Sequence, residues 1–238
     1  HSFVSEAFSG GCVVAVVEEG FVASASGVER FPLIFVKNSV HALGQFARFY
    51  RGKFDIPLIA ITGSNGKTTT KEMITEVLSQ KFTVLKTEGN LNNHIGVPQT
   101  LFRLEKKHDV AVIEMGTNHF GEIGYLCTVA EPTHGLITNI ARAHLEFFGD
   151  LEGVARAKGE LFQWLQPHGL GFVNADDPFV VQEARSLRRK YTYGFTGKRV
   201  NVKGRFLGLN EWIQPRFSFG GHPLSKPFSV QLRTYGRY

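Results

Sequence analysis

The residues with the clearest chemical potential lie in one glycine-rich segment, Ile61-Thr-Gly-Ser-Asn-Gly-Lys-Thr-Thr-Thr70. An apolar run at 58–62 precedes it, and a helical pattern at 68–80 follows it. Such a loop turns backbone N–H groups toward a phosphate, with Lys67 as a point charge and the Thr68 hydroxyl as a ligand for Mg²⁺. Ile61 stands where the usual pattern has its first glycine, but the flanking strand and helix favour a phosphate site over an accidental turn.

Two further apolar runs end abruptly in polar residues. The run 110–114 ends in Glu114, and the run 135–139 ends in Asn139, with His144 soon after. In a parallel sheet these strand ends meet at one edge, so we expect all three side chains near the phosphate loop. There Glu114 can hold Mg²⁺, and His144 can be a further ligand or an orienting group. Taken singly, Glu114 and His144 are typical of ordinary surface positions.

Two other features each allow a structural and a functional interpretation. Lys158 recurs at helical spacing with apolar residues of the predicted helix 151–166. Its ammonium therefore either reaches outward to water or serves an anionic or metal site. The loop 88–98 carries three asparagines that either bind a sugar or peptide or make turns.

The elements that must position these residues alternate along the chain. Strands are predicted at 12–17, 33–36, 58–62, 83–85, 110–114, 135–138 and 171–173, and helices at 39–50, 68–80, 121–130, 151–166 and 178–189. After Gly197, alternation such as that of Phe217 and Phe219 predicts antiparallel strands. The predicted fold class is α/β: a mostly parallel sheet of the phosphate-loop type with helices on both faces and an antiparallel β-rich tail. A boundary near 51–55 divides a partial α/β N-terminal domain, 1–54, from a central domain, 55–238.

The composition is that of a globular protein, with 238 residues of which 42% are hydrophobic and 20% charged, and a net charge of +6. It excludes a disordered or fibrous chain. No apolar run approaches the roughly 20 residues of a membrane helix, so a soluble intracellular protein is predicted. Cys12 and Cys127 lack the spacing of a metal site or a disulfide framework, and both are predicted to be buried. The basic stretch 185–205 is interpreted as a solvated face, because no recognised nucleic-acid motif accompanies it.

Together these segments resemble the Mur ligases, ATP-dependent amide-forming enzymes of cell-wall precursor synthesis. The segments that carry the resemblance are 61–73, Gly89-Asn-Leu-Asn-Asn-His-Ile-Gly-Val-Pro98, Glu114-Met-Gly-Thr-Asn-His119 with Gly121-Glu-Ile123, 138–146 and Ala157-Lys-Gly-Glu160. The phosphate loop is shared by the wider superfamily. The second and third segments look specific to the branch that adds D-alanyl-D-alanine. Ala141 and Phe147 stand where the family has glycines.

The resemblance implies ATP and two Mg²⁺ ions as cofactors. The implied ATP-binding residues are Gly63, Ser64, Asn65, Gly66, Lys67, Thr68, Thr69 and Asn139. The implied metal ligands are Thr68, Glu114, His144 and Lys158, the last as a carbamate, and the implied catalytic residues are Lys67, Lys158 and His144. Asn90, Asn92, Asn93, Asn118 and His119 are the implied substrate-binding residues.

The resemblance also implies a reaction, in which ATP phosphorylates the terminal carboxylate of a UDP-N-acetylmuramoyl-tripeptide and the amine of D-alanyl-D-alanine attacks the acyl phosphate. Its partners would be small molecules, without nucleic acid or membrane insertion, and the enzyme a cytoplasmic monomer. The two ends resemble interrupted domains, so we expect a fragment that is inactive alone. The alternatives are another ligase of the superfamily, such as a folylpolyglutamate synthase, a non-catalytic nucleotide switch, and a basic nucleic-acid-binding module.

Overall fold

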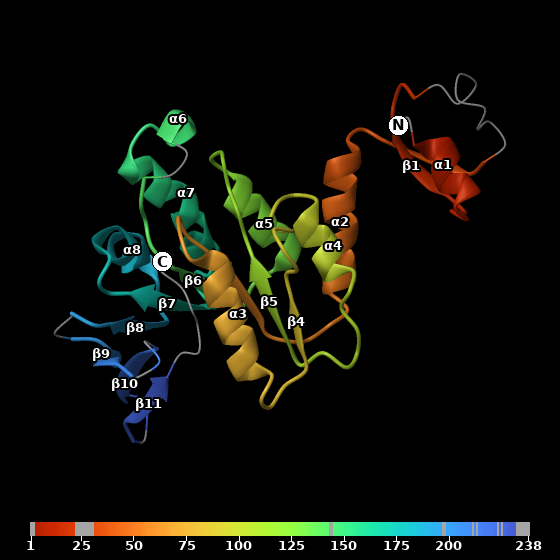
Figure 1. Cartoon of the computed structure of the whole chain (residues 1–238). Helices are drawn as coiled ribbons and strands as arrows, with labels where there is room; N and C mark the ends of the chain where they lie inside the picture. Colours follow the sequence, from red (N-terminus) through yellow and green to blue (C-terminus); the bar gives the residue numbers. More distant parts are fainter. Residues whose placement is uncertain are drawn as a thin grey trace.

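The computed structural model describes residues 3–21, 31–142, 145–196, 199–210, 212, 214–222, 224 and 226–231. A small N-terminal lobe precedes a larger α/β body (Figure 1). The lobe holds α1 (Val4–Ser9) and a parallel pair of short strands, β1 (Ala15–Glu18) and β2 (Leu33–Val36). Val4, Phe8 and Val17 form its own small core. A two-stranded sheet with so little buried surface is marginal in isolation.

The body is built on one sheet of nine strands within the described residues, in the order β11-β10-β9-β8-β7-β6-β3-β5-β4. The strands are β3 (Leu58–Thr62), β4 (Val84–Lys86), β5 (Val110–Glu114), β6 (His134–Ile137), β7 (Leu170–Asn174), β8 (Lys190–Gly194), β9 (Val202–Leu209), β10 (Pro215–Gly221) and β11 (Phe228–Gln231). Neighbours from β4 through β9 pair in parallel, and β9, β10 and β11 pair antiparallel. The chain leaves β3 toward β4 and β5 on one side and later returns to β6 on the other. Such a switch of direction opens a crevice at the carboxyl ends of the strands.

Helices cover both faces of the parallel strands, as Figure 1 shows. On one face α3 (Lys67–Leu78) packs over β3, β4 and β5. On the other face lie α4 (Gly96–Leu101), α5 (Glu122–Ala130) and α7 (Leu151–Trp164). The shorter helices are α6 (Leu145–Phe148) and α8 (Pro178–Glu183), which continues into a 3-10 turn at Ala184–Ser186. With helices on both faces, the central strands β3 and β5 are largely apolar and buried, and the mostly parallel sheet confirms the predicted fold class.

The helix α2 (Ser39–Arg51) links the lobe to the body. At its start, the Glu18 carboxylate accepts hydrogen bonds from the backbone N–H and the hydroxyl of Ser39, both at 2.9 Å. At its end, Arg51 is only 6% exposed and donates to the carbonyls of Ala130 and Ile56, at 3.1 and 2.9 Å. Arg51 therefore fixes the chain that leads into β3. The domain boundary at 54/55 stays a prediction, although α2 packs against α4 and α5 of the body.

Several details differ from the sequence expectations. The predicted helix 178–189 ends at Glu183, and residues 190–194 form β8 because Tyr191, Thr192 and Tyr193 favour a strand. The short helices α1, α4 and α6 were not predicted. The thiol of Cys127 is buried as expected, but Cys12 is exposed, so that part of the prediction is wrong.

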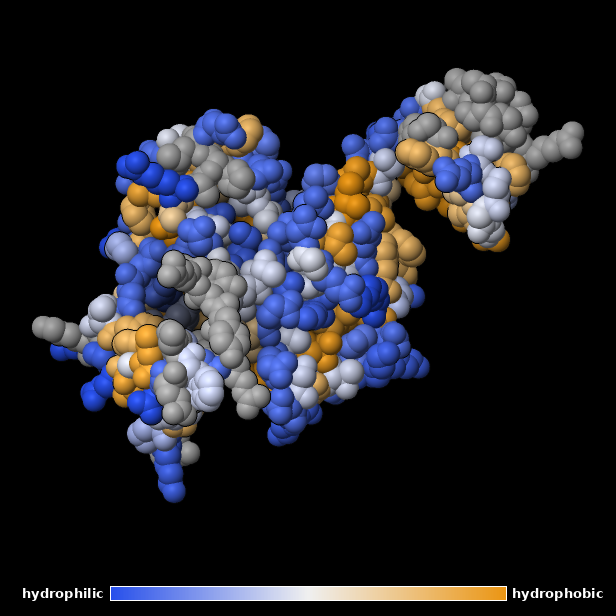
Figure 2. Space-filling view, viewed as in Figure 1, coloured by the Kyte–Doolittle hydropathy of each residue, from blue (hydrophilic) through white to orange (hydrophobic). Residues whose placement is uncertain are grey.

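The antiparallel strands are less well covered than the parallel ones. Phe206, Leu209 and Phe228 are each about half exposed, and Figure 2 shows apolar surface over this part of the molecule as well as over the N-terminal lobe. Among the described residues, no helix is both long and apolar enough to cross a membrane.

Candidate active site

The phosphate loop, residues 63–67, joins β3 to α3. Its backbone needs glycine at two positions: Gly63 has a φ of 144°, and Gly66, which caps α3, has a φ of 76°. A Cβ atom at Gly63 would lie 1.9 Å from the Thr138 hydroxyl, so space as well as conformation excludes a side chain there. Lys67 folds back over the loop, and its ammonium donates to the Gly63 carbonyl at 2.9 Å.

The end of β6 holds the same loop from the side. The Ser64 N–H donates to the Asn139 carbonyl at 2.9 Å, and the Asn65 N–H donates to the Asn139 side-chain oxygen at 3.2 Å. The Thr138 hydroxyl donates to the Asn65 carbonyl at 2.6 Å. Ala141 completes the set, because its N–H donates to the Ser64 hydroxyl at 3.0 Å. In this structure Asn139 therefore shapes the phosphate loop.

Glu114 ends β5 beside the loop and is only 2% exposed. One of its carboxylate oxygens accepts from the Thr68 hydroxyl at 2.9 Å, and the other accepts from the Asn92 amide at 2.8 Å. None of the ion pairs between described residues includes Glu114. A buried carboxylate held only by neutral donors is a position where a cation would be stabilised.

Lys158 points into the same region from α7. It is only 3% exposed, and burial first and the positive charge of Lys67 second lower its pKa to about 8. The two lysines thus lie close enough to feel each other's charge. The sequence allowed Lys158 either to reach outward to water or to point inward, and in the structure it points inward.

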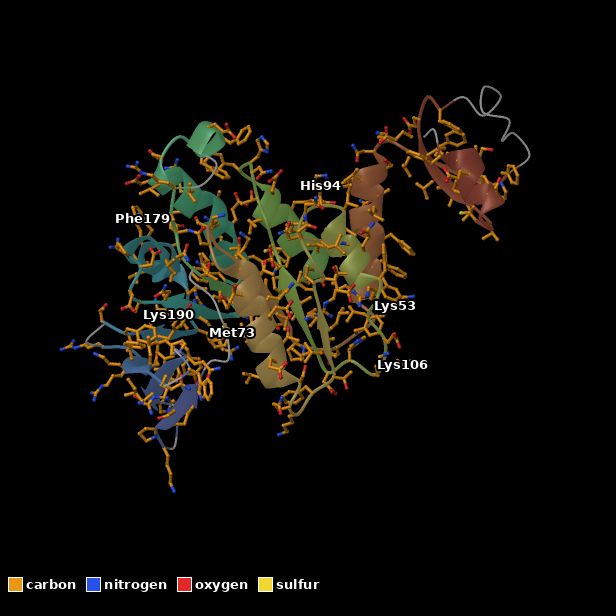
Figure 3. The ribbon with its side chains drawn as sticks, viewed as in Figure 1. Lys53, Met73, His94, Lys106, Phe179 and Lys190 are labelled. Atoms are coloured by element: carbon orange, nitrogen blue, oxygen red, sulfur yellow. The ribbon has the colours of Figure 1, made fainter. Side chains whose placement is uncertain are left out.

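The phosphate loop and Lys158 open onto one cleft of about 640 Å³ at the carboxyl ends of the strands. Its lining consists of Gly63, Ser64, Lys67, Asn92, Asn93, His94, Gly116, Thr117, Asn118, Phe120, Gly121, Glu122, Tyr125, Leu126 and Lys158. The cleft has two walls: the phosphate loop is one, and the loop 116–121, between β5 and α5, is the other. His94 lies toward the upper end of the body in Figure 3, whereas Lys53 and Lys106 lie lower.

Carboxylates hold the 116–121 loop. The Glu122 carboxylate accepts from the backbone N–H groups of Asn118 and His119, at 2.7 and 3.0 Å, and from the Thr117 hydroxyl at 3.0 Å. Burial alone would raise the pKa of Glu122, but these hydrogen bonds to the charged form outweigh it, and the net pKa is lowered. From α7, Glu160 accepts from the N–H groups of Gly121 and Gly124.

The predicted site residues fall into three groups. Gly63, Ser64, Lys67, Asn92, Asn93, Asn118 and Lys158 line the cleft, and Asn65, Gly66, Thr68, Thr69, Glu114 and Asn139 belong to the phosphate loop, its helix or the strand ends beside them. Asn90 and His119 are not part of the lining, and His144 lies outside the described residues. Within the described part of the chain no three His, Cys, Asp or Glu side chains cluster as a metal site would.

Local structure uses two of the asparagines. Asn92 holds Glu114, as described above, and the Asn93 side-chain oxygen accepts from the Gly96 N–H at 2.9 Å, at the start of α4. Their contacts with a substrate stay predictions. Sequence reasoning missed eight of the lining residues: His94, Gly116, Thr117, Phe120, Gly121, Glu122, Tyr125 and Leu126. Of these residues, His94 could have been predicted from its position, because it directly follows Asn92 and Asn93.

The sequence is similar to that of one known protein family. The family model described as "Mur ligase middle domain" matches residues 61–230. The UDP-N-acetylmuramoyl-tripeptide--D-alanyl-D-alanine ligase of Escherichia coli (strain K12) is 43% identical over 177 residues, which are 74% of this chain and 38% of that protein. The chain spans between 38% and 50% of the length of the curated relatives that it matches.

Solved structures agree with this result. A crystal structure of MurF from Acinetobacter baumannii superposes with a TM-score of 0.84 at 34% identity, covering 97% of this chain and 49% of that one. MurF ligase from Thermotoga maritima, crystallised in complex with ADP, gives 0.85 at 29% identity, covering 99% of this chain and 53% of that one. Since the middle-domain model covers more than half of the sequence, the chain belongs to the Mur ligase family.

Proposed function

We propose that this chain carries the nucleotide-binding centre of an ATP-dependent ligase that joins D-alanyl-D-alanine to UDP-N-acetylmuramoyl-tripeptide. The observation that carries the proposal is the phosphate loop, whose helix brings the Thr68 hydroxyl to the buried Glu114 at 2.9 Å. The names of the relatives support the substrates, and the ADP complex of the Thermotoga protein supports the nucleotide. The proposed enzyme acts as a cytoplasmic monomer on small molecules, without nucleic acid.

The phosphate loop would bind the polyphosphate of ATP. The positive end of α3 begins at this loop, and Lys67 can exchange the Gly63 carbonyl for phosphate oxygens. This arrangement favours charge that builds up on the transferred phosphoryl group. Asn65, Gly66, Thr69 and Asn139 would contribute mainly by keeping the loop in shape, as the bonds between Asn139 and Asn65 already do.

The site fits Mg²⁺ at Thr68 and Glu114. Hard cations of this size prefer oxygen ligands and take few of them from the protein when phosphates supply the rest. The buried Glu114 carboxylate, with only neutral donors against it, is the observation that supports the ion. When bound, Mg²⁺ would neutralise phosphate charge during the transfer. His144 stays a predicted ligand of a second ion.

Lys158 would serve the reaction as a carbamate. A lowered pKa leaves more of its amine neutral near physiological pH, and a neutral amine adds CO₂ to form a carbamate and release a proton. The product is an anion with two oxygens in place of a buried cation beside Lys67. Such a group would remove the repulsion between the two lysines and supply a metal ligand.

In the proposed reaction the protein mainly positions its substrates. The terminal carboxylate of the tripeptide attacks the γ-phosphorus of ATP, and ADP leaves. The amine of D-alanyl-D-alanine then attacks the carbonyl carbon of the acyl phosphate, and phosphate and a proton leave as the amide forms. Asn118 and the other residues of the 116–121 loop would hold the UDP-N-acetylmuramoyl-tripeptide, which accepts the phosphoryl group, opposite the phosphate loop.

The test combines binding and turnover. Titration calorimetry measures Mg-ATP and Mg-GTP binding to the wild type, to Lys67→Ala and to the control Lys53→Ala, a surface lysine away from the cleft. We expect ATP to be preferred and Lys67→Ala alone to bind at least about 100-fold more weakly. Phosphate release is then measured with UDP-N-acetylmuramoyl-tripeptide, with and without D-alanyl-D-alanine. Equal binding by the wild type and Lys67→Ala, or release that another amino acid supports better, would contradict the proposal.

A further inference from the structure

Glu160 joins two parts of the cleft that the sequence keeps far apart. It lies on α7, two residues after Lys158, and both of its carboxylate oxygens are used. One accepts from the Gly121 N–H at 2.7 Å, and the other accepts from the Gly124 N–H at 2.8 Å. Gly121 caps α5 without a side chain of its own and ends the 116–121 loop. A carboxylate on another helix therefore supplies the cap that α5 lacks.

The two hydrogen bonds to Glu160 are suited to fixing the position of the 116–121 loop against α7. Hydrogen bonds from N–H groups to a carboxylate are shorter and stronger than those between neutral groups, and two from one side chain fix its direction as well as its distance. Gly121 has a φ of 83°, and a Cβ atom at Gly124 would lie 3.5 Å from Glu160, in ordinary contact. The charge also reaches the middle of α5, where burial first and Glu160 second raise the pKa of the Cys127 thiol.

The geometry points to Glu160 as a positioning residue that sets the distance between Lys158 and the 116–121 loop. The inference rests on the proposed function, in which the 116–121 loop helps to hold the UDP-N-acetylmuramoyl-tripeptide. Glu122 orders the loop from within, through Asn118 and His119. Glu160 then ties the ordered loop to α7, the helix that carries Lys158. Without this tie the loop keeps its shape but loses its fixed place against the phosphate site.

The decisive variant is Glu160→Gln, which has the same size but meets one of the two N–H groups with its own amide N–H. Asp150→Asn is the matched control, since Asp150 caps α7 by accepting from the Gly153 N–H at 2.7 Å and does not line the cleft. Both variants remove a carboxylate that caps a helix. A merely structural role for Glu160 predicts a similar loss of stability in both variants and no selective loss of affinity for UDP-N-acetylmuramoyl-tripeptide in Glu160→Gln.

Amide hydrogen exchange, measured with bound Mg-ADP, reports on the loop directly. We expect exchange at Gly121 and Gly124 to accelerate at least about tenfold in Glu160→Gln and to stay unchanged in Asp150→Asn. UDP-N-acetylmuramoyl-tripeptide should bind about tenfold more weakly to Glu160→Gln alone, with the affinity for Mg-ADP kept in both variants. In turnover, KM for this substrate should rise more than kcat falls.

The outcomes separate this inference from the proposed function. Unchanged exchange in Glu160→Gln, or the same acceleration and affinity loss in Asp150→Asn, overturns the positioning role. If the wild type fails to bind the UDP-tripeptide, the proposed function fails, but exchange at Gly121 and Gly124 still decides whether Glu160 fixes the loop. Loss of Mg-ADP affinity in Glu160→Gln would mean that the whole cleft has changed, and would also overturn the inference.

Discussion

In the phosphate loop, glycines with positive φ and hydrogen bonds to the end of β6 set the backbone, whereas in the 116–121 loop two carboxylates hold it. Backbone conformation and close packing determine the shape of the phosphate loop, the first wall of the cleft. The charged carboxylates of Glu122 and Glu160 hold the 116–121 loop, the second wall. The first should therefore respond to added atoms and the second to loss of charge, and the same kind of substitution should have different effects in the two walls.

Alanine at Gly63 and at Gly121 tests this contrast and should give the largest effect. Both glycines have positive φ, but a Cβ atom at Gly63 meets Thr138 at 1.9 Å, whereas one at Gly121 meets nothing within 4 Å. We expect Gly63→Ala to lower the free energy of unfolding by more than about 3 kcal/mol and to abolish nucleotide binding. Gly121→Ala should lower it by only about 1 kcal/mol. Urea unfolding and ATP titration measure both effects, and equal losses would refute the contrast.

Replacing Lys158, which lies between the walls, should stabilise the fold. Its pKa of about 8 in the folded state lies below the ordinary lysine value of 10.5, so the buried ammonium destabilises the fold at neutral pH. Lys158→Met should raise the free energy of unfolding by about 3 kcal/mol at pH 7 in buffer free of bicarbonate.

The pH dependence of this gain checks its origin. Between pH 8 and 10.5 the unfolded chain binds more protons than the folded one, so wild-type stability rises with pH and the advantage of Lys158→Met shrinks. Urea unfolding at pH 7 and pH 10 measures it, with the exposed Lys53→Met as the control. A destabilised Lys158→Met variant at pH 7 would mean that the ammonium has a compensating partner.

Glu114→Gln should have a smaller and more specific effect on the phosphate side. The Thr68 hydroxyl can reverse its hydrogen bond and accept from the new amide, so the fold should survive. The proposed Mg²⁺ ligand is lost, and the affinity for Mg-ATP should drop about tenfold, to the level of ATP with EDTA. Titration calorimetry with and without Mg²⁺ makes the comparison. A persistent gain from Mg²⁺ in the variant would move the metal site away from Glu114.

The smallest effect is expected when the pH is lowered and Glu122, which holds the 116–121 loop, becomes protonated. The pKa of Glu122 is lowered below the ordinary glutamate value of 4.5, so its hydrogen bonds stabilise the loop above pH 4.5 and are lost as the pH falls through the lowered pKa. NMR shifts of the Asn118 and His119 amides should follow this titration. In Glu122→Gln they should show no such step. A step near 4.5 or above in the wild type would contradict the assignment.

Local signals predicted the phosphate side of the site well. The glycines, Lys67 and the polar ends of two strands mark it in the sequence, and Glu114 and Asn139 do lie beside the loop. The α/β sheet followed from the alternation of apolar strands and helices. The short helix α4 was missed because Gly96 and Pro98 are poor helix signals in isolation.

The carboxylate side could not be predicted in the same way. Glu160 is separated from Gly121 by 39 positions, and their contact depends on how α7 packs against α5. Glu122 is four residues from Asn118, yet nothing in the sequence distinguishes it from an ordinary acid at the start of a helix. Lys158 was left undecided because helical spacing gives the face of a helix but not what covers it.

The hydrogen bonds between the phosphate loop and the end of β6 also have a kinetic consequence. Ser64 and Asn65 are held by Thr138, Asn139 and Ala141, so the loop is complete only after β3 and β6, some 75 positions apart, have paired. Pairing over such a distance is slow, whereas β9, β10 and β11 join through local connections. A nucleotide bound to this loop should therefore slow unfolding and leave the rate of folding nearly unchanged.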